Sequence, residues 1–145
     1  MILYADSSSI VSLHAQEPGR HVAVREAVAA ADFVSCSGIG YAEVRAGLAR
    51  ARRQQRIDDA AYDRALRDFH RDWRRYMKVQ PSNRLLRLAG DLAEKHALRG
   101  YDAVHLASAL TLRDRIPDTV AMSTWDSRLS QAAAAEGFSL VHEAT

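Results

Sequence analysis

The chain has 145 residues, of which 48% are hydrophobic and 26% charged, a size and composition that favour one folded domain (residues 1–145) and exclude wholesale disorder. Its formal net charge of +2 is too small to argue for a nucleic-acid partner by itself. The single cysteine, Cys36, excludes an internal disulfide, and no apolar stretch approaches the roughly 18 residues of a membrane helix, so we expect a cytoplasmic protein without membrane contact.

Short apolar strands alternate with amphipathic helices along the chain, and Pro18, Pro81 and Pro117 mark breaks between them. In chain order, we expect a strand over 2–5, helices over 7–15 and 19–31, a strand over 32–36, helices over 38–55 and 58–75, a strand over 76–79, helices over 82–97 and 101–115, a strand over 119–122, a helix over 126–136 and a strand over 138–142. This alternation predicts an α/β fold with a mostly parallel sheet and helices on both faces. The two helices of 38–75 are rich in polar residues and closely connected, which indicates a helical hairpin that stands away from the sheet.

Four acidic residues each lie at or near the start of a predicted helix, next to an apolar segment. Asp6 ends the first strand, and Asp126 follows the strand over 119–122. Glu43 lies about one turn inside the helix over 38–55. Asp102 follows Gly100, a natural helix break, and lies in the first turn of the next helix. One such acid alone is most simply a helix cap, because a negative charge there is favoured by the helix dipole.

All four acids together favour a shared site. In a parallel α/β sheet, the carboxyl ends of the strands and the amino ends of the following helices meet along one edge. Converging carboxylates repel one another and need a cation, and oxygen ligands suit Mg²⁺ or Mn²⁺. Such ions can activate a water and stabilise the leaving oxygen of a phosphodiester. The sequence therefore predicts a divalent metal site with nuclease chemistry.

The residues of these segments and their spacing resemble the sequences of PIN-domain ribonucleases, and within that family those of the VapC-type toxins of bacterial toxin–antitoxin pairs. The resemblance rests on Asp6–Ser8 after an N-terminal strand, Glu43 in a mid-chain helix, Asp102 within YDAVHLASAL, and Ser123–Asp126 near the end. It covers essentially the whole chain. It implies a PIN-like three-layer α/β/α fold with about five strands, a metal-dependent endoribonuclease activity, an RNA substrate, an antitoxin partner and a homodimer.

The resemblance also implies roles for individual residues. The catalytic acids are expected to be Asp6, Glu43, Asp102 and Asp126. Asp6 and Asp102 correspond to direct metal ligands, whereas the other two acids bind through water. Ser8 and Thr124 match family positions whose hydroxyls support the acids.

Most basic residues are arginines, since Lys78 and Lys95 are the only lysines among the 20 lysine and arginine residues. Guanidinium binds phosphate in a bidentate manner, although a bias in genomic base composition is an equally good explanation. Arg45 and Arg99, each close to a predicted site acid, are expected to reach a scissile phosphate or to hold the acids apart. The others are expected to form a solvated or partner-binding face: Arg50, Arg52, Arg53, Arg56, Arg64, Arg67, Arg71, Arg74 and Arg75.

Several further residues have two interpretations. His105 lies one turn after Asp102 and either orients a carboxylate or is a hydrogen-bonded packing residue. Tyr101 and Trp125, each beside a site acid, are expected to pack, with stacking on unpaired bases as the alternative. The histidines lack the HExxH zinc pattern.

Two other functions compete with the nuclease. A receiver or phosphotransfer domain also has an aspartate after its first strand, but it usually has paired acids there or a late lysine, and no lysine follows Lys95. A PIN-like module that binds RNA or protein without cleaving it is the stronger alternative.

Overall fold

The first strand of the chain lies in the middle of the sheet, because it pairs with strands that come both soon after it and near the end of the chain. The computed structural model describes all 145 residues. Its five strands have the order β3-β2-β1-β4-β5, and every neighbouring pair is parallel. The strands are β1 (Ile2–Ala5), β2 (Phe33–Ser37), β3 (Met77–Val79), β4 (Val120–Ser123) and β5 (Ser139–Leu140). The predicted parallel sheet of about five strands is confirmed.

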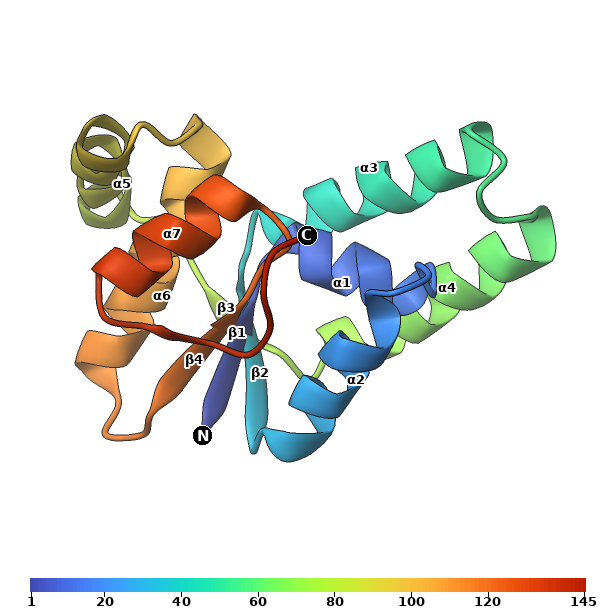
Figure 1. Ribbon diagram of the computed structural model, residues 1–145, viewed down its shortest axis with the longest axis horizontal. Helices are drawn as coiled ribbons and strands as arrows, with labels where there is room; N and C mark the ends of the chain where they lie inside the picture. The colour runs from blue at the N-terminus through green and yellow to red at the C-terminus, as the bar shows by residue number, and fades with distance from the viewer.

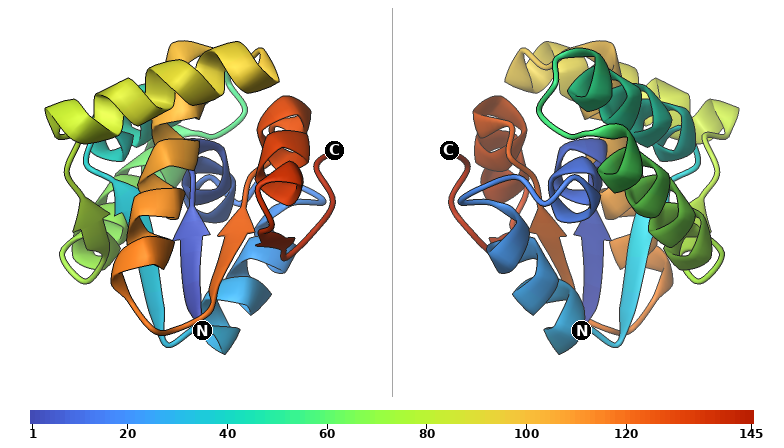
Figure 2. Two further views of the ribbon diagram at one scale, coloured as in Figure 1. Left: turned by 90° about the vertical axis from the view of Figure 1, so that its left-hand side faces the viewer. Right: turned by 90° about the vertical axis from the view of Figure 1, so that its right-hand side faces the viewer.

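Helices cover both faces of this sheet, so the predicted three-layer α/β/α architecture is also confirmed (Figures 1 and 2). Helices α5, α6 and α7 lie on one face, and α1 to α4 lie on the other. The helices are α1 (Ser7–His14), α2 (His21–Ala30), α3 (Gly40–Arg53), α4 (Asp59–Trp73), α5 (Asn83–His96), α6 (Gly100–Arg115) and α7 (Ser127–Ala135).

Two apolar clusters hold the layers together. The larger one, of 20 buried residues, joins the sheet to α5, α6 and α7. Helix α6 is buried along most of its length, and Ala103, Leu106 and Leu110 belong to this cluster. They are therefore core residues of one chain rather than a dimer seam. The smaller cluster, of nine residues, joins β1 and β2 to α1, α3 and α4.

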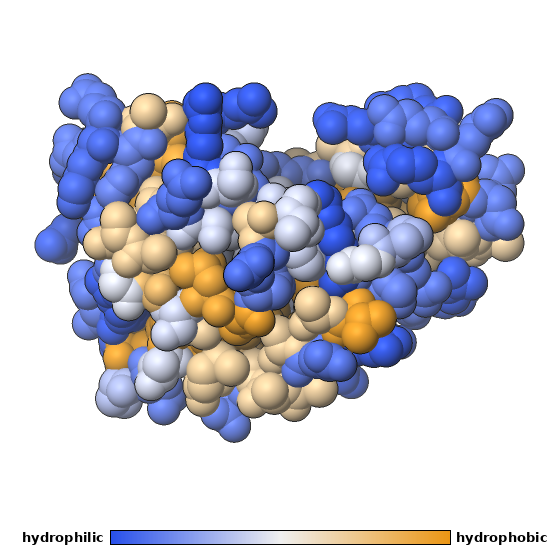
Figure 3. Space-filling model, viewed as in Figure 1, coloured by the Kyte–Doolittle hydropathy of each residue, from blue (hydrophilic) through white to orange (hydrophobic).

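The expected helical hairpin is present, and Figure 1 shows α3 and α4 extending beyond the sheet as an arm. Val44, Leu48 and Phe69 are fully buried at its base. Gly47 lets α3 approach α1, because a Cβ at this position would lie 2.6 Å from Val11 Cγ2. In the space-filling view, most of the outer surface of the arm is hydrophilic, and a notch separates it from the α5–α7 side (Figure 3).

The strand order reverses between β1 and β4. The chain builds outward from β1 through β2 to β3, and then returns through α5 and α6 to place β4 on the other side of β1. In open parallel sheets, the crevice beyond the carboxyl ends of the strands at such a reversal is the usual ligand site. Here Asp6 follows β1, and residues 124–126 follow β4.

The expected bounds of all the elements agree with the structure to within two residues. For the last strand this shortens 138–142 to Ser139–Leu140, because the chain leaves the sheet after Val141 donates a hydrogen bond to Met122 O. The ring of His142 then stacks on Trp125, with 3.8 Å between ring centroids. No helix combines the length and the apolar character that crossing a membrane requires.

Candidate active site

Asp6 is fixed in place by hydrogen bonds to both of its carboxylate oxygens. It is the N-cap of α1, where Oδ1 accepts hydrogen bonds from the backbone N–H of Ser9 at 3.0 Å and from Ser8 Oγ at 2.7 Å. Oδ2 accepts a hydrogen bond from Thr124 Oγ1 at 2.5 Å. The side chain is almost fully buried. The sequence prediction that Ser8 and Thr124 support this acid agrees with these contacts, although it assigned no geometry to them.

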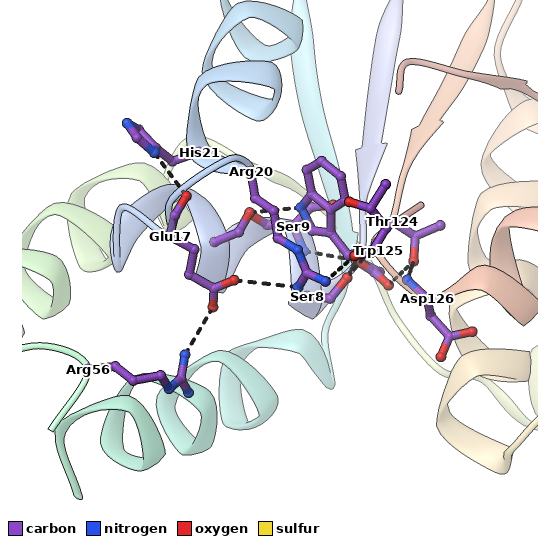
Figure 4. A network of polar contacts seen from close by, with 12 residues as sticks. Ser8, Ser9, Glu17, Arg20, His21, Arg56, Thr124, Trp125 and Asp126 are labelled. Carbon is purple, nitrogen blue, oxygen red and sulfur yellow. Dashed lines mark hydrogen bonds and ion pairs between the residues drawn. The ribbon is translucent and has the colours of Figure 1, made fainter. Parts of the chain in front are cut away.

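Asp126 has the equivalent position after β4. Its Oδ1 caps α7 by accepting a hydrogen bond from the N–H of Leu129 at 2.8 Å, and its own N–H donates to Thr124 Oγ1 at 3.1 Å. Thr124 therefore links two acids through one hydroxyl (Figure 4). Asp6 and Asp126 are thus both helix caps, and both lie at the carboxyl edge of the sheet where the sequence predicts a shared site.

Glu43 reaches the same edge from the first turn of α3, where a buried histidine orients it. His105 Nε2 lies 2.6 Å from Glu43 Oε1, and Nδ1 lies 2.8 Å from the Tyr4 hydroxyl. The Tyr4 oxygen accepts a hydrogen bond from the N–H of Ser37 at 3.0 Å, so its own hydrogen is available for Nδ1. This assigns the remaining hydrogen of the neutral imidazole to Nε2, which donates to Glu43.

The charge state of His105 reflects two opposing effects. Burial lowers the pKa of His105, but the hydrogen bond to Glu43 and the negative charges of Asp6, Glu43 and Asp102 outweigh it, so the pKa is raised. His105 is 1% exposed, so it supports an acid from inside the protein and does not line an open groove. Its contacts fit both of its sequence interpretations, because the ring is hydrogen-bonded inside the core and one of its partners is the Glu43 carboxylate.

Asp102 lies in the first turn of α6 and forms no hydrogen bond through its carboxylate. Burial raises its pKa, and the negative charges of Asp126, Asp6 and Glu43 raise it further, while His105 acts in the opposite direction. Charges affect one another in this way only over short distances. Three predicted acids from separate parts of the chain therefore lie near enough to influence Asp102. Glu43 also lines one recess with Asp102.

The donor chemistry of this region fits a hard dication. Carboxylate oxygens are the ligands that Mg²⁺ and Mn²⁺ prefer, and a bound dication would offset the repulsion that raises the pKa of Asp102. In the structure, no three Asp, Glu, His or Cys side chains are drawn together closely enough to form a complete metal site.

The two predicted supporting arginines have different surroundings. The Arg45 guanidinium lies 5.7 Å from the ring centre of Tyr41 and donates a hydrogen bond to its hydroxyl at 3.1 Å. It is thus bound to the hairpin and contacts no acid. Arg99, at the N-cap of α6, lines an open recess together with Asp102 and Glu43.

The two aromatic residues beside the acids differ in exposure. Trp125 packs as expected, since its Nε1 donates to Ser12 Oγ at 2.9 Å and its ring is covered by His142. The Arg20 guanidinium also lies over this ring (Figure 4). The expectation that Tyr101 packs is wrong, because this side chain is 67% exposed. The first turn of α6 directs Tyr101 to solvent while the following residues fill the core.

Sequence reasoning missed the buried partners of the acids. Tyr4 is the clearest case, since a tyrosine in a buried strand looks like any other apolar residue until its hydroxyl is seen to join Ser37 and His105. Ser9 is a second case, since its Oγ lies 2.7 Å from Ser123 Oγ at the end of β4. No local pattern signals either contact.

Comparison with known proteins agrees with this geometry. The PIN domain family matches residues 3–135. Ribonuclease VapC45 and Ribonuclease VapC49, from two strains of Mycobacterium tuberculosis, are each 38% identical over 136 residues, which cover 94% of this chain and 92% of the relative.

Solved structures share the fold at low sequence identity. A toxin–antitoxin complex from Klebsiella pneumoniae has a TM-score of 0.68 at 19% identity and covers 99% of both chains. The Mycobacterium tuberculosis toxin VapC20, described as cleaving the sarcin–ricin loop, has a TM-score of 0.61 at 18% identity and covers 94% of this chain and 95% of its own. With the family match and the sequence relatives over nearly the whole length, these findings show that this chain belongs to the PIN domain family and, within it, to the VapC proteins.

Proposed function

We propose that this protein is a divalent-metal-dependent endoribonuclease that acts as the toxin of a toxin–antitoxin pair. The observation that carries the proposal is the placement of the four acids where the strand order reverses: Asp6 and Asp126 cap the helices that follow β1 and β4, and Glu43 and Asp102 line one recess. The relatives named as VapC ribonucleases support the same activity.

In this proposal, Asp6 and Asp102 bind a Mg²⁺ or Mn²⁺ ion directly, and Glu43 and Asp126 act through water. When bound, the ion supplies Lewis acidity and lowers the pKa of a water that attacks the phosphodiester. Ser8 and Thr124 hold the Asp6 carboxylate in a fixed orientation before any ligand arrives, which limits the reorganisation that binding requires.

The chemistry needs no covalent intermediate on the protein. Cys36, the one thiol, is fully buried, and burial raises its pKa well above the usual value. It is therefore neither accessible nor readily ionised. Cleavage is direct hydrolysis, with the acids positioning the reacting groups.

The remaining expectations extend the proposal to partners and location. An antitoxin is expected to cover the acid site, and the hydrophilic α3–α4 arm beside it provides a surface for that contact. We also propose a homodimer, although Ala103, Leu106 and Leu110 are buried in the core and do not form its interface. A single domain that works in the cytoplasm agrees with the free, buried Cys36.

Cleavage of single-stranded RNA by the purified protein, with the new RNA ends sequenced, tests the activity. We expect cleavage in Mg²⁺ or Mn²⁺ and none in EDTA. Asp102→Asn should abolish it without harming the fold, because the Asp102 carboxylate has no hydrogen bond to lose. Asp6→Asn should abolish it as well, and Asp91→Asn, which changes an exposed acid on α5, should leave it unchanged.

A binding readout separates this enzyme from a non-catalytic module. At a metal concentration of 100 times the dissociation constant, binding should stabilise the wild type by about 2.7 kcal/mol, and Asp102→Asn should remove most of that gain. RNA binding without cleavage in either metal would favour the module. Cleavage that survives both EDTA and Asp102→Asn would refute the proposed mechanism.

A further inference from the structure

Tyr101 is the most exposed large hydrophobic side chain of the protein, and it stands directly beside a site acid. It is 67% exposed, compared with 8% for Trp125, the aromatic neighbour of Asp126. Leaving an aromatic ring in water forgoes the burial free energy that Trp125 gains. One exposed ring is ordinary in itself, so the meaning of Tyr101 depends on its surroundings.

Those surroundings combine acids, cations and an aromatic ring in one place. Glu43, Arg50, Arg99, Tyr101 and Asp102 line an open recess of about 520 Å³ with Gly100. Two site acids therefore share the recess with the ring. Any molecule that contacts Tyr101 from this side lies next to the proposed reaction centre.

The two arginines of the recess are free to bind an anion. Arg50 and Arg99 are exposed, and neither forms an ion pair, whereas Arg20, Arg56 and Arg71 each pair with an acid. Guanidinium groups without a carboxylate partner are suited to bidentate binding of phosphate oxygens. They also offset part of the negative charge that the site acids present to an approaching RNA.

From this arrangement we propose that Tyr101 stacks on an unpaired base that flanks the scissile phosphate, while Arg50 and Arg99 bind the neighbouring phosphates. The inference rests on the proposed function and names residues that bind its RNA substrate. A cationic groove with an aromatic stacking platform is how proteins hold unpaired nucleic acid. A base inside a duplex cannot reach the ring unless it leaves its own stack.

When no antitoxin covers the acid site, the composition of this recess suits RNA. Its one exposed ring stands beside two arginines that have no carboxylate partner, and these two kinds of group together are how proteins hold unpaired nucleic acid. Tyr101 therefore selects for the structure of the substrate: a nucleotide that is already unpaired binds without the cost of unstacking.

Fluorescence anisotropy with a labelled 12-nucleotide oligo(A) RNA tests the stacking, in EDTA so that nothing is cleaved. Tyr101→Ala and Tyr101→Leu should each weaken binding by about 5- to 150-fold, while Tyr101→Phe and Tyr101→Trp keep it within a few-fold. Leu86→Ala, which removes another exposed hydrophobic side chain on α5, is the matched control and should have no effect. Annealing oligo(U) to the probe should weaken its binding to the wild type, and the wild type and Tyr101→Leu should then bind the duplex with equal affinity.

The arginines have a separate signature. Arg99→Gln should weaken single-stranded and duplex probes alike, and it should lower the salt dependence of log affinity by about 0.7 per lost phosphate contact. If Tyr101→Leu binds oligo(A) and cleaves single-stranded RNA as the wild type does, the stacking role is wrong, although the nuclease stands. The stacking role is also wrong, and the nuclease stands, if Tyr101→Ala changes self-association but leaves RNA binding unchanged. Binding that depends on the ring, in a protein that cleaves no RNA, would refute the nuclease and leave the stacking role intact.

Discussion

Replacing Tyr4 by phenylalanine removes one oxygen atom from the interior and tests whether the acid site depends on a buried hydrogen-bond chain. The Tyr4 side chain is 0% exposed, and its hydroxyl contacts Ser37 N at 3.0 Å and His105 Nδ1 at 2.8 Å. In Tyr4→Phe both groups lose their partner where water cannot replace it. A buried polar group without a partner costs about 1–3 kcal/mol. We therefore expect a loss of about 2–4 kcal/mol in the free energy of unfolding, since the hydroxyl no longer has to be desolvated either.

Urea unfolding followed by circular dichroism measures this loss, because a chain of this length is expected to unfold in one step. The melting temperature should fall by about 5–15 °C. Tyr62→Phe is the control: this hydroxyl forms no hydrogen bond within the protein, and its ring lies 4.0 Å from the Arg52 guanidinium, so its removal should change stability by less than about 0.5 kcal/mol. If both variants unfold at the wild-type urea concentration, the chain from Ser37 to His105 does not stabilise the fold.

Two further predictions concern stability. The raised pKa of Asp102 means that its charged form opposes folding. In the absence of metal, its contribution to stability should therefore rise as the pH falls from neutral through that pKa toward the ordinary value of 3.8. Without metal, Asp102→Asn should be more stable than the wild type at neutral pH, with a gap that closes in acid, and a less stable variant in neutral urea titrations would contradict this. Gly47→Ala should cost about 1–3 kcal/mol of overpacking against the stiff Val11 side chain, whereas Gly90→Ala, whose Cβ meets nothing within 4 Å, should gain about 0.5–1 kcal/mol. A gain in stability for both variants in chemical denaturation would show that helix propensity, not packing, decides at Gly47 as well.

The order of the elements was predictable because the signals for it are local. An apolar run followed by an acid and small polar residues marks the end of a strand and the start of a helix, and Asp6 and Asp126 both cap the helices so predicted. Parallel pairing then brings these positions to one edge of the sheet without further information.

The contacts within the site were not predictable, because they join residues far apart in the chain. His105 bonds Glu43 across 62 positions and Tyr4 across 101. Tyr101 and Trp125 each precede an acid, yet one is exposed and the other buried. The difference depends on which face of the fold each segment meets, and the sequence alone carries no signal for that.

The central position of β1 has a consequence for protein synthesis. Thr124 holds the Asp6 carboxylate across 118 positions, and β1 gains its second neighbour only when β4 is present. A nascent chain on the ribosome therefore exposes one edge of β1, and leaves Asp6 without its Thr124 partner, until residues 120–124 have been synthesised. Products of premature termination before this point lack both Thr124 and Asp126, so an interrupted message yields fragments that cannot assemble the acid cluster.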